Sequence, residues 1–388
     1  MTEKHNNKQN NILVFIRWPI GGIRTFCKYI YNNFEPNKYN FIFLAPDIDD
    51  TQHILHDLNQ FNPHFIPVTQ KGREFNKLFD LRLSAISLFK KEINLIHSHG
   101  ISAGLLCAVP ARLLKIPHLM TIHETLTTEQ FRSIRGRFKK ALLTLLLPMV
   151  NIIHHVSSDA KENILENIPI LKMFPDKHVV IHNGINVEQF TKANAKDFSR
   201  ELDLPEKCFL IGFMGRFMPE KGFRYLVDAI ELLSKEKNLT RNPVVLAYGW
   251  GAFIREEQEN IRRKQLNSYF RFMPFTADVA SALKGLDVLV VPSLREACPL
   301  LPMEAMVAGV PVIGTSCIGL REVLAGTPAF VIPPKDSKAI FRAILKELNN
   351  PSKEVAKGLI RIVSKKFDVS KQARAIKIEI NKMMKPNL

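Results

Sequence analysis

The stretch DVLVVPSLREACPLLPMEAMVAGVPVIGT, residues 287–315, decides the fold of this chain. Its first seven residues, 287–293, are apolar and β-branched, which is typical of a buried strand. Residues 299–308 have helical character, Gly309 ends that helix, and residues 310–315 predict a second buried strand. A strand, a helix and a further strand in this order predict a parallel α/β sheet.

Two glutamates eight positions apart lie in this stretch. Glu296 follows the carboxyl end of the first strand, and Glu304 lies on the helix. In an open parallel sheet, ligands bind beyond the carboxyl ends of the strands, and a helix N-terminus offers free N–H groups to an anion. Carboxylates on either side of such a dipole suit a ligand with phosphates in its middle and hydroxyl groups at both ends. We therefore predict a nucleotide-sugar site here.

Strand-like and helix-like segments alternate along the whole chain, which predicts parallel sheets covered on both faces. We expect strands at 11–16, 40–45, 64–68, 93–97, 117–122, 151–156, 208–214, 243–248, 269–272, 286–292, 310–314 and 329–332. In the first half we expect helices at 22–34, 52–60, 74–91, 101–115 and 131–147. Residues 353–385 have a helical, basic pattern.

The length of 388 residues is too great for one compact core, so two domains are expected. Asn183-Gly184 is a turn signal at the end of a strand, and it marks the join between two alternating blocks. We predict an α/β protein with doubly wound domains at 1–182 and 183–367. Residues 368–388 are expected to form a C-terminal helix that crosses back to the first domain.

The charge and the cysteine content limit the kinds of binding partner and the cell compartment that we expect for this chain. A net charge of +17 calls for a polyanionic partner, but the excess is spread over both halves, so we expect no nucleic acid. The five cysteines lack CxxC spacing, which indicates neither a zinc site nor a disulfide framework. The polar start runs directly into a strand, and the longest apolar stretch, 141–153, is too short to cross a membrane. We expect a cytoplasmic chain.

The second strong motif is GFMGRFMPEKGFRYLVDAI, residues 212–230. A strand leads into a loop that contains Arg216 and Lys221 between glycines, and a helix follows. Arginine can hold two phosphate oxygens, lysine adds a point charge, and glycine allows close approach, so the loop suits a diphosphate. It matches neither the Walker pattern nor GxGxxG. Alone it could equally be an ordinary loop with two surface cations, but the Glu296/Glu304 run favours the phosphate site.

Weaker signals follow other strands. Gly21-Gly22 lies between the first strand and the first helix, where it indicates either a ligand's close approach or a tight turn. LIHSHG (95–100) and TIHET (121–125) place histidines at the carboxyl ends of strands. His123, followed by Glu124, is the stronger functional candidate, and His99 is evenly balanced between a functional and a structural role. We interpret His97 as a packed, hydrogen-bonded residue, and His154-His155 as structural.

Taken together, GRFMPEKG (215–222), HNGIN (182–186) and the Glu-x7-Glu run that ends in EAMVAGVPVI (304–313) resemble the retaining glycosyltransferases of family 4. Residues 21–23, 154–164 and 277–293 match as well, so the resemblance covers nearly the whole chain. It implies the GT-B fold, in which two Rossmann-like domains face each other across a cleft. The N-terminal domain would bind the acceptor, and the C-terminal domain would bind the nucleotide-sugar donor.

The resemblance also implies roles in the donor site. Arg216 and Lys221 would hold the donor diphosphate and stabilise the leaving group. Glu304 would hydrogen-bond the ribose, and Glu296 would contact the hydroxyls of the transferred sugar as part of the catalytic set. Gly21 and Gly22 would lie near the donor phosphate.

The resemblance implies that His123 would contact the sugar as the second catalytic residue, and we expect His99 and Glu124 on the acceptor side. The family is described without a clear protein nucleophile, so none is assigned. The acidic run DIDD (47–50) is interpreted as a solvated turn. Neither a metal nor another cofactor is expected.

One departure from the family pattern concerns the phosphate. The loop after the first glutamate often reads Glu-x-Phe-Gly-Leu, whereas this chain has Pro299 where glycine often stands. Proline has no N–H and suits the first turn of a helix. We therefore expect the amides of Leu300 and Leu301 to bind the phosphate.

Residues 131–150 are basic and apolar, with no carboxylate between Glu129 and Asp159. Similar transferases dock on anionic membranes through such a region to reach lipid-linked acceptors. The segment therefore predicts peripheral contact with the inner face of the cytoplasmic membrane. The alternative is that its leucine-rich part packs on the sheet.

Three hypotheses follow for the function. The first is transfer of a hexosyl unit from a nucleoside diphosphate sugar to a glycan or glycolipid hydroxyl in the synthesis of a cell-surface polysaccharide such as lipopolysaccharide. The second is a GT-B epimerase or hydrolase that acts on a nucleotide-sugar. The third is a non-catalytic module that binds anionic lipid or nucleic acid, motivated by the charge of +17.

Overall fold

The computed structural model describes residues 9–68, 93–205 and 207–384. The chain divides into two compact units: unit 1 comprises Met1–Asn183 and Val369–Leu388, and unit 2 comprises Gly184–Asp368. The helix expected at 74–91 lies outside the described residues. Each unit contains a parallel sheet, as the alternation of apolar strands and amphipathic helices predicted.

Unit 1 contains a seven-stranded sheet in the order β3-β2-β1-β4-β5-β6-β7, and every pair of neighbours within its described residues is parallel. Its strands are β1 (Asn10–Ile16), β2 (Tyr39–Pro46), β3 (His64–Val68), β4 (Leu95–His99), β5 (His118–Ile122), β6 (Ile152–His155) and β7 (His178–Val180). Its helices are α1 (Gly22–Tyr31), α2 (Asp49–Asp57), α4 (Ile101–Leu113), α5 (Ile134–Leu146), α6 (Ser158–Asn167) and α17 (Val369–Met384).

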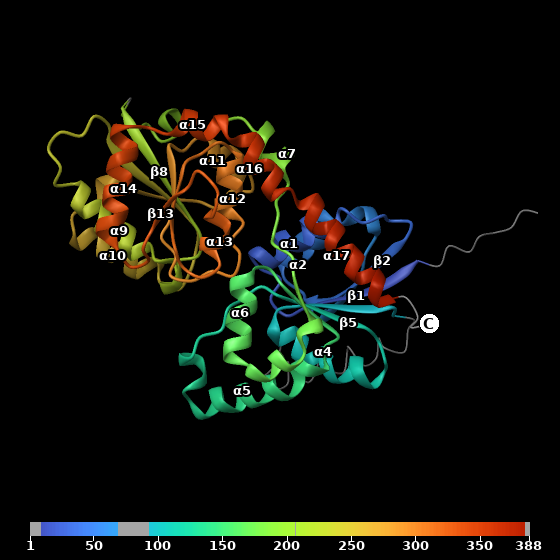
Figure 1. Ribbon diagram of the computed structural model, residues 1–388. Coiled ribbons are helices and arrows are strands. Elements are labelled where there is room, and N and C mark those ends of the chain that lie inside the picture. The colour runs from blue at the N-terminus through green and yellow to red at the C-terminus, as the bar shows by residue number, and fades with distance from the viewer. Residues whose placement is uncertain (1–8, 69–92, 206, 385–388) are drawn as a thin grey trace, which may run out of the picture. The chain divides into compact units, whose positions relative to one another are not determined.

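Helices cover both faces of the unit 1 sheet (Figure 1). Alternate residues of β1, β2 and β4 pack on Ala103, Cys107 and Ala111 of α4. The opposite face carries aromatic and histidine side chains around Tyr31 of α1. On the same unit, α17 is attached by a hydrogen bond of 2.8 Å from the hydroxyl of Tyr39 to Asn381.

Unit 2 contains a six-stranded parallel sheet in the order β10-β9-β8-β11-β12-β13. Its strands are β8 (Cys208–Met214), β9 (Asn242–Tyr248), β10 (Phe270–Met273), β11 (Val288–Val291), β12 (Val312–Thr315) and β13 (Phe330–Ile332). Its helices are α7 (Val187–Lys192), α8 (Phe198–Glu201), α9 (Phe223–Leu233), α10 (Ile254–Arg263), α11 (Val279–Lys284), α12 (Leu301–Val307), α13 (Leu320–Leu324), α14 (Ser337–Asn349), α15 (Lys353–Gly358) and α16 (Ile360–Phe367).

The core of unit 2 lies between its sheet and the helices α9, α10 and α14, which Figure 1 shows on one side of the strands. Short polar side chains start several of the helices because they accept a hydrogen bond from a free N–H of the first turn. Asp278 accepts from Ser281 N at the start of α11, and Asp336 accepts from Ala339 N at the start of α14.

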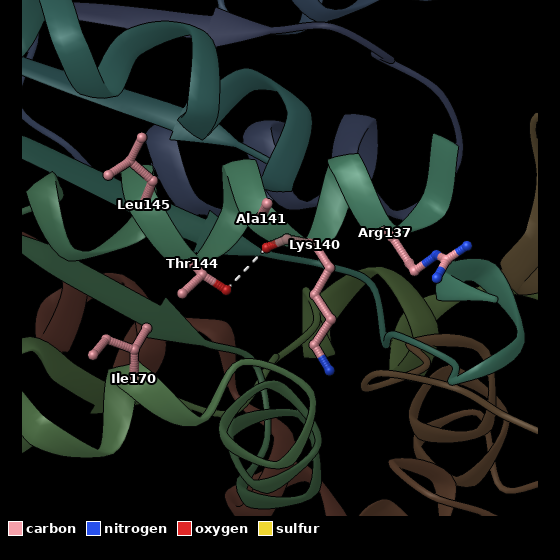
Figure 2. Close-up of a pocket in the computed structure, with 6 residues that line it drawn as sticks. All are labelled: Arg137, Lys140, Ala141, Thr144, Leu145 and Ile170. Carbon is pink, nitrogen blue, oxygen red and sulfur yellow. Dashed lines mark hydrogen bonds between the residues drawn. The ribbon is translucent and has the colours of Figure 1, made fainter. Parts of the chain in front are cut away.

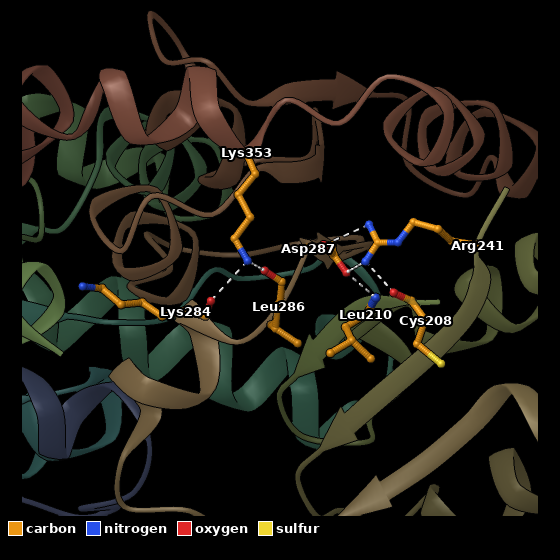
Figure 3. A network of polar contacts seen from close by, with 7 residues as sticks. All are labelled: Cys208, Leu210, Arg241, Lys284, Leu286, Asp287 and Lys353. Atoms are coloured by element: carbon orange, nitrogen blue, oxygen red, sulfur yellow. Dashed lines mark hydrogen bonds and ion pairs between the residues drawn. The ribbon is translucent and has the colours of Figure 1, made fainter. Parts of the chain in front are cut away.

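A charged network closes the amino ends of β8, β9 and β11 (Figure 3). Arg241 holds both carboxylate oxygens of Asp287, with N–O distances of 3.2 and 2.9 Å, and Asp287 also accepts from Leu210 N at 2.7 Å. The ammonium group of Lys353 donates to the carbonyl oxygens of Lys284 and Leu286 at the end of α11. Each of these charges has a polar partner.

One helix prediction needs correction. The helix expected at 299–308 begins at Leu301, so Pro302 rather than Pro299 occupies its first turn. The helical pattern at 353–385 comprises α15, α16 and α17, and α17 lies within the C-terminal helix expected at 368–388. At the boundary between α16 and α17, the N–H of Ile185 donates to Phe367 O at 2.8 Å.

Candidate active site

The candidate residues of unit 2 lie where the strand order reverses. The sheet runs outward from β8 in one direction and from β11 in the other, which is the topological switch point of a doubly wound sheet. Arg216 and Lys221 follow β8, whereas Glu296 follows β11. The loops beyond these two carboxyl ends are therefore adjacent although 75 residues separate Lys221 from Glu296.

Glu296 is held by two partners in the ligand-free chain. Its Oε1 accepts hydrogen bonds from the ammonium group of Lys221 and from the hydroxyl of Ser293, both at 2.7 Å. The Lys221 and Glu296 side chains are 25% and 11% exposed, so the ion pair is partly shielded from water. Sequence reasoning did not identify Ser293, although its place as the last residue of the DVLVVPS run was a usable signal.

Glycines allow the loops to come this close. Gly222 has φ of 68°, and a Cβ added there would lie 2.0 Å from Pro292 O, the residue before Ser293. Gly319 has φ of 76°, and an added Cβ would lie 2.3 Å from Glu296 O. Both positions therefore require glycine for backbone reasons.

Glu304 is buried on α12, with 8% of its surface exposed, and its carboxylate has no hydrogen-bond or ion-pair partner among the described residues. Burial without a partner disfavours the charged form. It raises the pKa of Glu304 from 4.5 to about 7. A buried polar group without a partner requires an explanation, and a ligand that donates hydroxyl hydrogens would supply one.

Arg216 is exposed, and no described residue forms a hydrogen bond or ion pair with its guanidinium. Large aromatic side chains lie close in sequence to the carboxyl ends of neighbouring strands: Trp250 follows β9 and is 62% exposed, and Phe275 follows β10 and is 82% exposed. Neither aromatic residue could be identified from the sequence, because a single aromatic residue in a loop belongs to no recognisable motif. An exposed cation and aromatic surface at one sheet edge suit a phosphate and a flat ring.

The glycines of unit 1 occupy the corresponding place after β1. Gly21 has φ of 58° and precedes α1, and Gly22 opens that helix. A Cβ added at either would meet no atom within 4 Å. The backbone therefore requires glycine only at Gly21, and the open space beside Gly22 remains available to a ligand.

The histidines after β4 and β5 are linked to one another. His99 Nδ1 lies 3.1 Å from His123 Nε2, and the two ring centroids are 5.3 Å apart with an angle of 26° between the ring planes, so the rings meet edge to edge. His97 and His154 are buried and hydrogen-bonded, as the sequence predicted. Burial lowers the pKa of His123 to about 3 and that of His99 well below 6.5, so both rings are neutral near pH 7.

Glu124 caps a helix in the ligand-free chain. Its Oε1 accepts from Ile101 N at 2.8 Å at the start of α4, and its Oε2 accepts from His123 N at 3.3 Å. Burial raises its pKa above the ordinary value of 4.5. Glu124 thus positions the backbone of His123, and its role on the acceptor side stays a prediction.

Helix α5 has one buried and one exposed apolar face. Leu143, together with Leu147 directly after the helix, packs in the core of unit 1, as the packing alternative predicted. Ile134, Phe138 and Leu145 are 79%, 67% and 63% exposed on the other side. Figure 2 shows a groove along this helix, lined by Arg137, Lys140, Ala141, Thr144, Leu145 and Ile170. No helix in the described part of the chain is long and apolar enough to cross a bilayer.

Comparison with known proteins supports one family. The family model described as "Glycosyltransferase Family 4" matches residues 20–189, and the model described as "Glycosyl transferases group 1" matches 208–350. The chain is 26% identical over 293 residues to UDP-Gal:alpha-D-GlcNAc-diphosphoundecaprenol alpha-1,3-galactosyltransferase of Escherichia coli, which covers 73% of each chain. It is 26% identical over 290 residues to the putative teichuronic acid biosynthesis glycosyltransferase TuaC of Bacillus subtilis, covering 73% of this chain and 69% of TuaC.

Solved structures of other proteins share this fold. HepE of Anabaena, in complex with UDP and glucose, matches with a TM-score of 0.80 at 18% identity, over 96% of this chain and 100% of HepE. The two parallel-sheet units are therefore the Rossmann-like domains of a GT-B protein. On the strength of both family matches and the shared fold, this chain belongs to the glycosyltransferases of group 1 and family 4.

Proposed function

We propose that this glycosyltransferase moves a hexosyl unit from a UDP-sugar to a hydroxyl of a glycan or lipid-linked acceptor, with retention at the anomeric carbon, in cell-surface polysaccharide synthesis. The observation that carries the proposal is the set of groups at the unit 2 switch point: Arg216, Lys221 beside Glu296, and the buried carboxylate of Glu304. The names of the relatives support the context, since one uses UDP-galactose on a diphosphoundecaprenol acceptor and another serves teichuronic acid synthesis.

Each group would have a defined part in donor binding. Arg216 and Lys221 would neutralise the diphosphate as negative charge develops on it, which lowers the barrier because the charges are already in place. The amides of Leu300 and Leu301 would add hydrogen bonds to the same phosphates. Glu304 would accept from the ribose hydroxyls, and Glu296 would accept from the hydroxyls of the transferred sugar.

The transfer itself would need no covalent enzyme intermediate. The bond between the sugar C1 and the diphosphate oxygen breaks, and the acceptor oxygen bonds to C1 on the same face. The acceptor proton passes to the departing phosphate. His123, which is neutral near pH 7, would hydrogen-bond the sugar rather than transfer a proton. His99 and Glu124 would lie on the acceptor side, Gly21 and Gly22 would admit the donor phosphate, and the two cations would replace a metal ion.

A donor screen tests this proposal. UDP-, GDP- and ADP-hexoses are added separately to the chain, and the melting temperature is measured, because a ligand that binds only the folded state stabilises it. We expect a UDP-hexose to raise the melting temperature most, and Arg216→Ala to abolish the shift. Arg342→Ala, which removes an exposed arginine from α14, is the matched control.

Product analysis separates transfer from the epimerase or hydrolase alternative. We expect a UDP-hexose to be consumed only when an acceptor is present, to give an anomerically retained glycoside, and to be consumed equally well in EDTA. Turnover without any acceptor, yielding an epimer or a free sugar, would contradict the proposal. A glycosyltransferase family match already disfavours a non-catalytic module.

We further propose that the exposed face of α5 contacts an anionic membrane surface. Ile134, Phe138 and Leu145 would enter the interface, while Arg137 and Lys140 beside them would pair with headgroups. This face would bring a lipid-linked acceptor to unit 1. We expect Phe138→Glu to reduce co-sedimentation with vesicles that contain phosphatidylglycerol, and not with neutral vesicles. Ile362→Glu, at an equally exposed apolar position of unit 2, should change nothing.

A further inference from the structure

A continuous chain of hydrogen bonds crosses unit 1 from a backbone carbonyl to His123. The six successive distances are 2.9, 3.0, 2.8, 2.9, 2.8 and 3.1 Å. Its members, in order, are Ile181 O, His154, Thr121, His97, Tyr31, His99 and His123. Four histidines, a threonine and a tyrosine thus share one path beneath α1.

The interior of this path is closed to water. The side chains of Tyr31, His97, His99, Thr121 and His154 are each at most 1% exposed. Buried polar atoms must find partners within the protein, so each of these groups depends on its two neighbours in the chain. Burial also lowers the pKa of His154 to about 4 and that of His97 well below 6.5, so each ring carries a single proton near pH 7.

The first link decides which atom donates and which accepts at every later link of the path. Ile181 O can only accept, so His154 Nε2 carries the proton and His154 Nδ1 is an acceptor. The hydroxyl of Thr121 therefore donates to His154 Nδ1. Having used its only hydrogen, Thr121 accepts from Nε2 of His97, which leaves His97 Nδ1 unprotonated.

The same logic continues to the end of the path. The hydroxyl of Tyr31 donates to His97 Nδ1 and accepts from Nε2 of His99. His99 Nδ1 is then an acceptor, so the proton between the last two rings belongs to His123 Nε2. The Nδ1 atom of His123 carries a lone pair, and no described residue donates to it.

We propose that this hydrogen-bonded path fixes His123 in its Nε2–H tautomer, so that Nδ1 presents a lone pair to a hydroxyl of the bound sugar or acceptor, and that Tyr31 is a positioning residue for the transfer. The ligand hydroxyl in this statement rests on the proposed function, whereas the tautomer does not. With the other tautomer, Nδ1–H would compete as a donor and would repel the hydroxyl hydrogen.

The path also explains why so many histidines lie in one sheet. A neutral histidine has one donor and one acceptor nitrogen. In a series of such rings, the assignment of donor and acceptor in one ring fixes the assignment in the next, and no ring carries a charge. An ionised residue at the same depth would have to be desolvated at high cost. Tyr31 is the only member that joins α1 to the strands among the described links, and it connects His97 to His99.

The test is nuclear magnetic resonance on the full chain labelled with ¹⁵N-histidine. Protonated and unprotonated ring nitrogens have well-separated ¹⁵N shifts, so long-range proton–nitrogen spectra report the tautomer of each ring. The ring signals of His123 are assigned as the set that disappears from the spectrum of the His123→Gln variant. We expect a protonated Nε2 and a bare Nδ1 for His123 in the free chain. A protonated Nδ1, or shifts averaged between the two tautomers, would overturn the proposal.

Tyr31→Phe tests the role of the path. It removes the hydroxyl that links His97 to His99, so we expect the His123 shifts to move toward the average while those of His154 stay as they were. Turnover should fall about 10-fold with little change in KM for the donor. Tyr39→Phe is the matched control, because it removes a tyrosine hydroxyl that hydrogen-bonds Asn381 outside the path. Unchanged His123 shifts in folded Tyr31→Phe protein would contradict the proposal.

A second pair of variants covers the case in which Tyr31→Phe does not fold. Thr121→Val breaks the path between His154 and His97, whereas Thr121→Ser keeps the hydroxyl. We expect mixed His123 tautomers in the first and the native tautomer in the second. Because the shifts are read without substrate, a chain that shows the expected tautomer but transfers no sugar would refute the proposed function and leave this inference standing.

Discussion

Charged side chains lie at both ends of the parallel sheet of unit 2, but their surroundings differ. At the amino ends, Arg241, Asp287 and Lys353 each have two or more polar partners (Figure 3). At the carboxyl ends, Arg216 and the buried Glu304 have no side-chain partner among the described residues. The first end stabilises the fold. At the second end, the buried carboxylate of Glu304 has no protein partner in the described part of the chain, which costs stability, whereas the exposed Arg216 faces solvent.

Lys221→Ala should have the largest effect on activity. Because the ammonium group would stabilise the leaving diphosphate, we expect kcat to fall by about 10²–10³-fold, or about 3–4 kcal/mol of transition-state stabilisation. The free energy of unfolding should change little. Lys264→Ala is the control: its side chain is 27% exposed against 25% for Lys221, and it is also ion-paired, but with Asp228 and Glu231 of α9. Equal activity of the two variants would contradict the role of Lys221.

Asp287→Ala should have the opposite pattern, with a loss of stability and no loss of activity. It removes the two-oxygen pair with Arg241 and the acceptor of Leu210 N. We expect the free energy of unfolding to fall by about 2–3 kcal/mol, with activity per folded molecule unchanged. Urea denaturation and kcat measure the two quantities. Glu259→Ala, which breaks an exposed ion pair with Arg262, should change stability by less than about 0.5 kcal/mol.

Glu304→Gln should stabilise the chain at alkaline pH and weaken donor binding. The pKa of Glu304 is about 7 when folded against 4.5 ordinarily, so the unfolded state releases its proton first and stability falls as pH rises from 4.5 to 7. Glutamine removes that loss. We expect a gain of about 1–3 kcal/mol at pH 8 and almost none at pH 4.5. Binding of UDP should weaken about 10-fold, because an amide cannot accept both ribose hydroxyls as strongly.

Glu347→Gln sharpens this comparison. Glu347 is 9% exposed, close to the 8% of Glu304, but its carboxylate accepts from the N–H and hydroxyl of Ser352 at 3.0 and 2.8 Å. We expect this variant to lose stability at pH 8 and to bind UDP normally. If both substitutions raised the free energy of unfolding at pH 8, burial alone, and not the missing partner, would explain the effect of Glu304 on stability.

The strands and the donor motif could be predicted because they depend on local sequence. Residues 208–214 form a short apolar run, and residues 287–293 contain three valines, so both segments favour a buried strand on local sequence alone. The parallel order places Lys221 and Glu296 after neighbouring strands. The sequence assigned the two residues to one donor site through their motifs and the family resemblance, not through strand order.

What the sequence missed depends on contacts between distant residues. The link from Tyr31 to His97 joins residues 66 positions apart, and no pattern within α1 marks that tyrosine. The boundary between α16 and α17 coincides with a pairing to Ile185, far away in sequence. That Glu304 has no partner is likewise a property of the fold, since its own helix has an ordinary apolar composition.

Ser293→Ala should have the smallest effect at the carboxyl end. Its hydroxyl donates to the same oxygen of Glu296 that Lys221 holds, so the carboxylate keeps one of its two partners. We expect kcat/KM to fall about 5–10-fold, equivalent to about 1 kcal/mol for one hydrogen bond. Ser234→Ala is the control, because that hydroxyl donates to Glu231 O on α9, away from the sheet edge. A loss as large as that of Lys221→Ala would mean that Ser293, rather than the cation, decides how Glu296 faces the sugar.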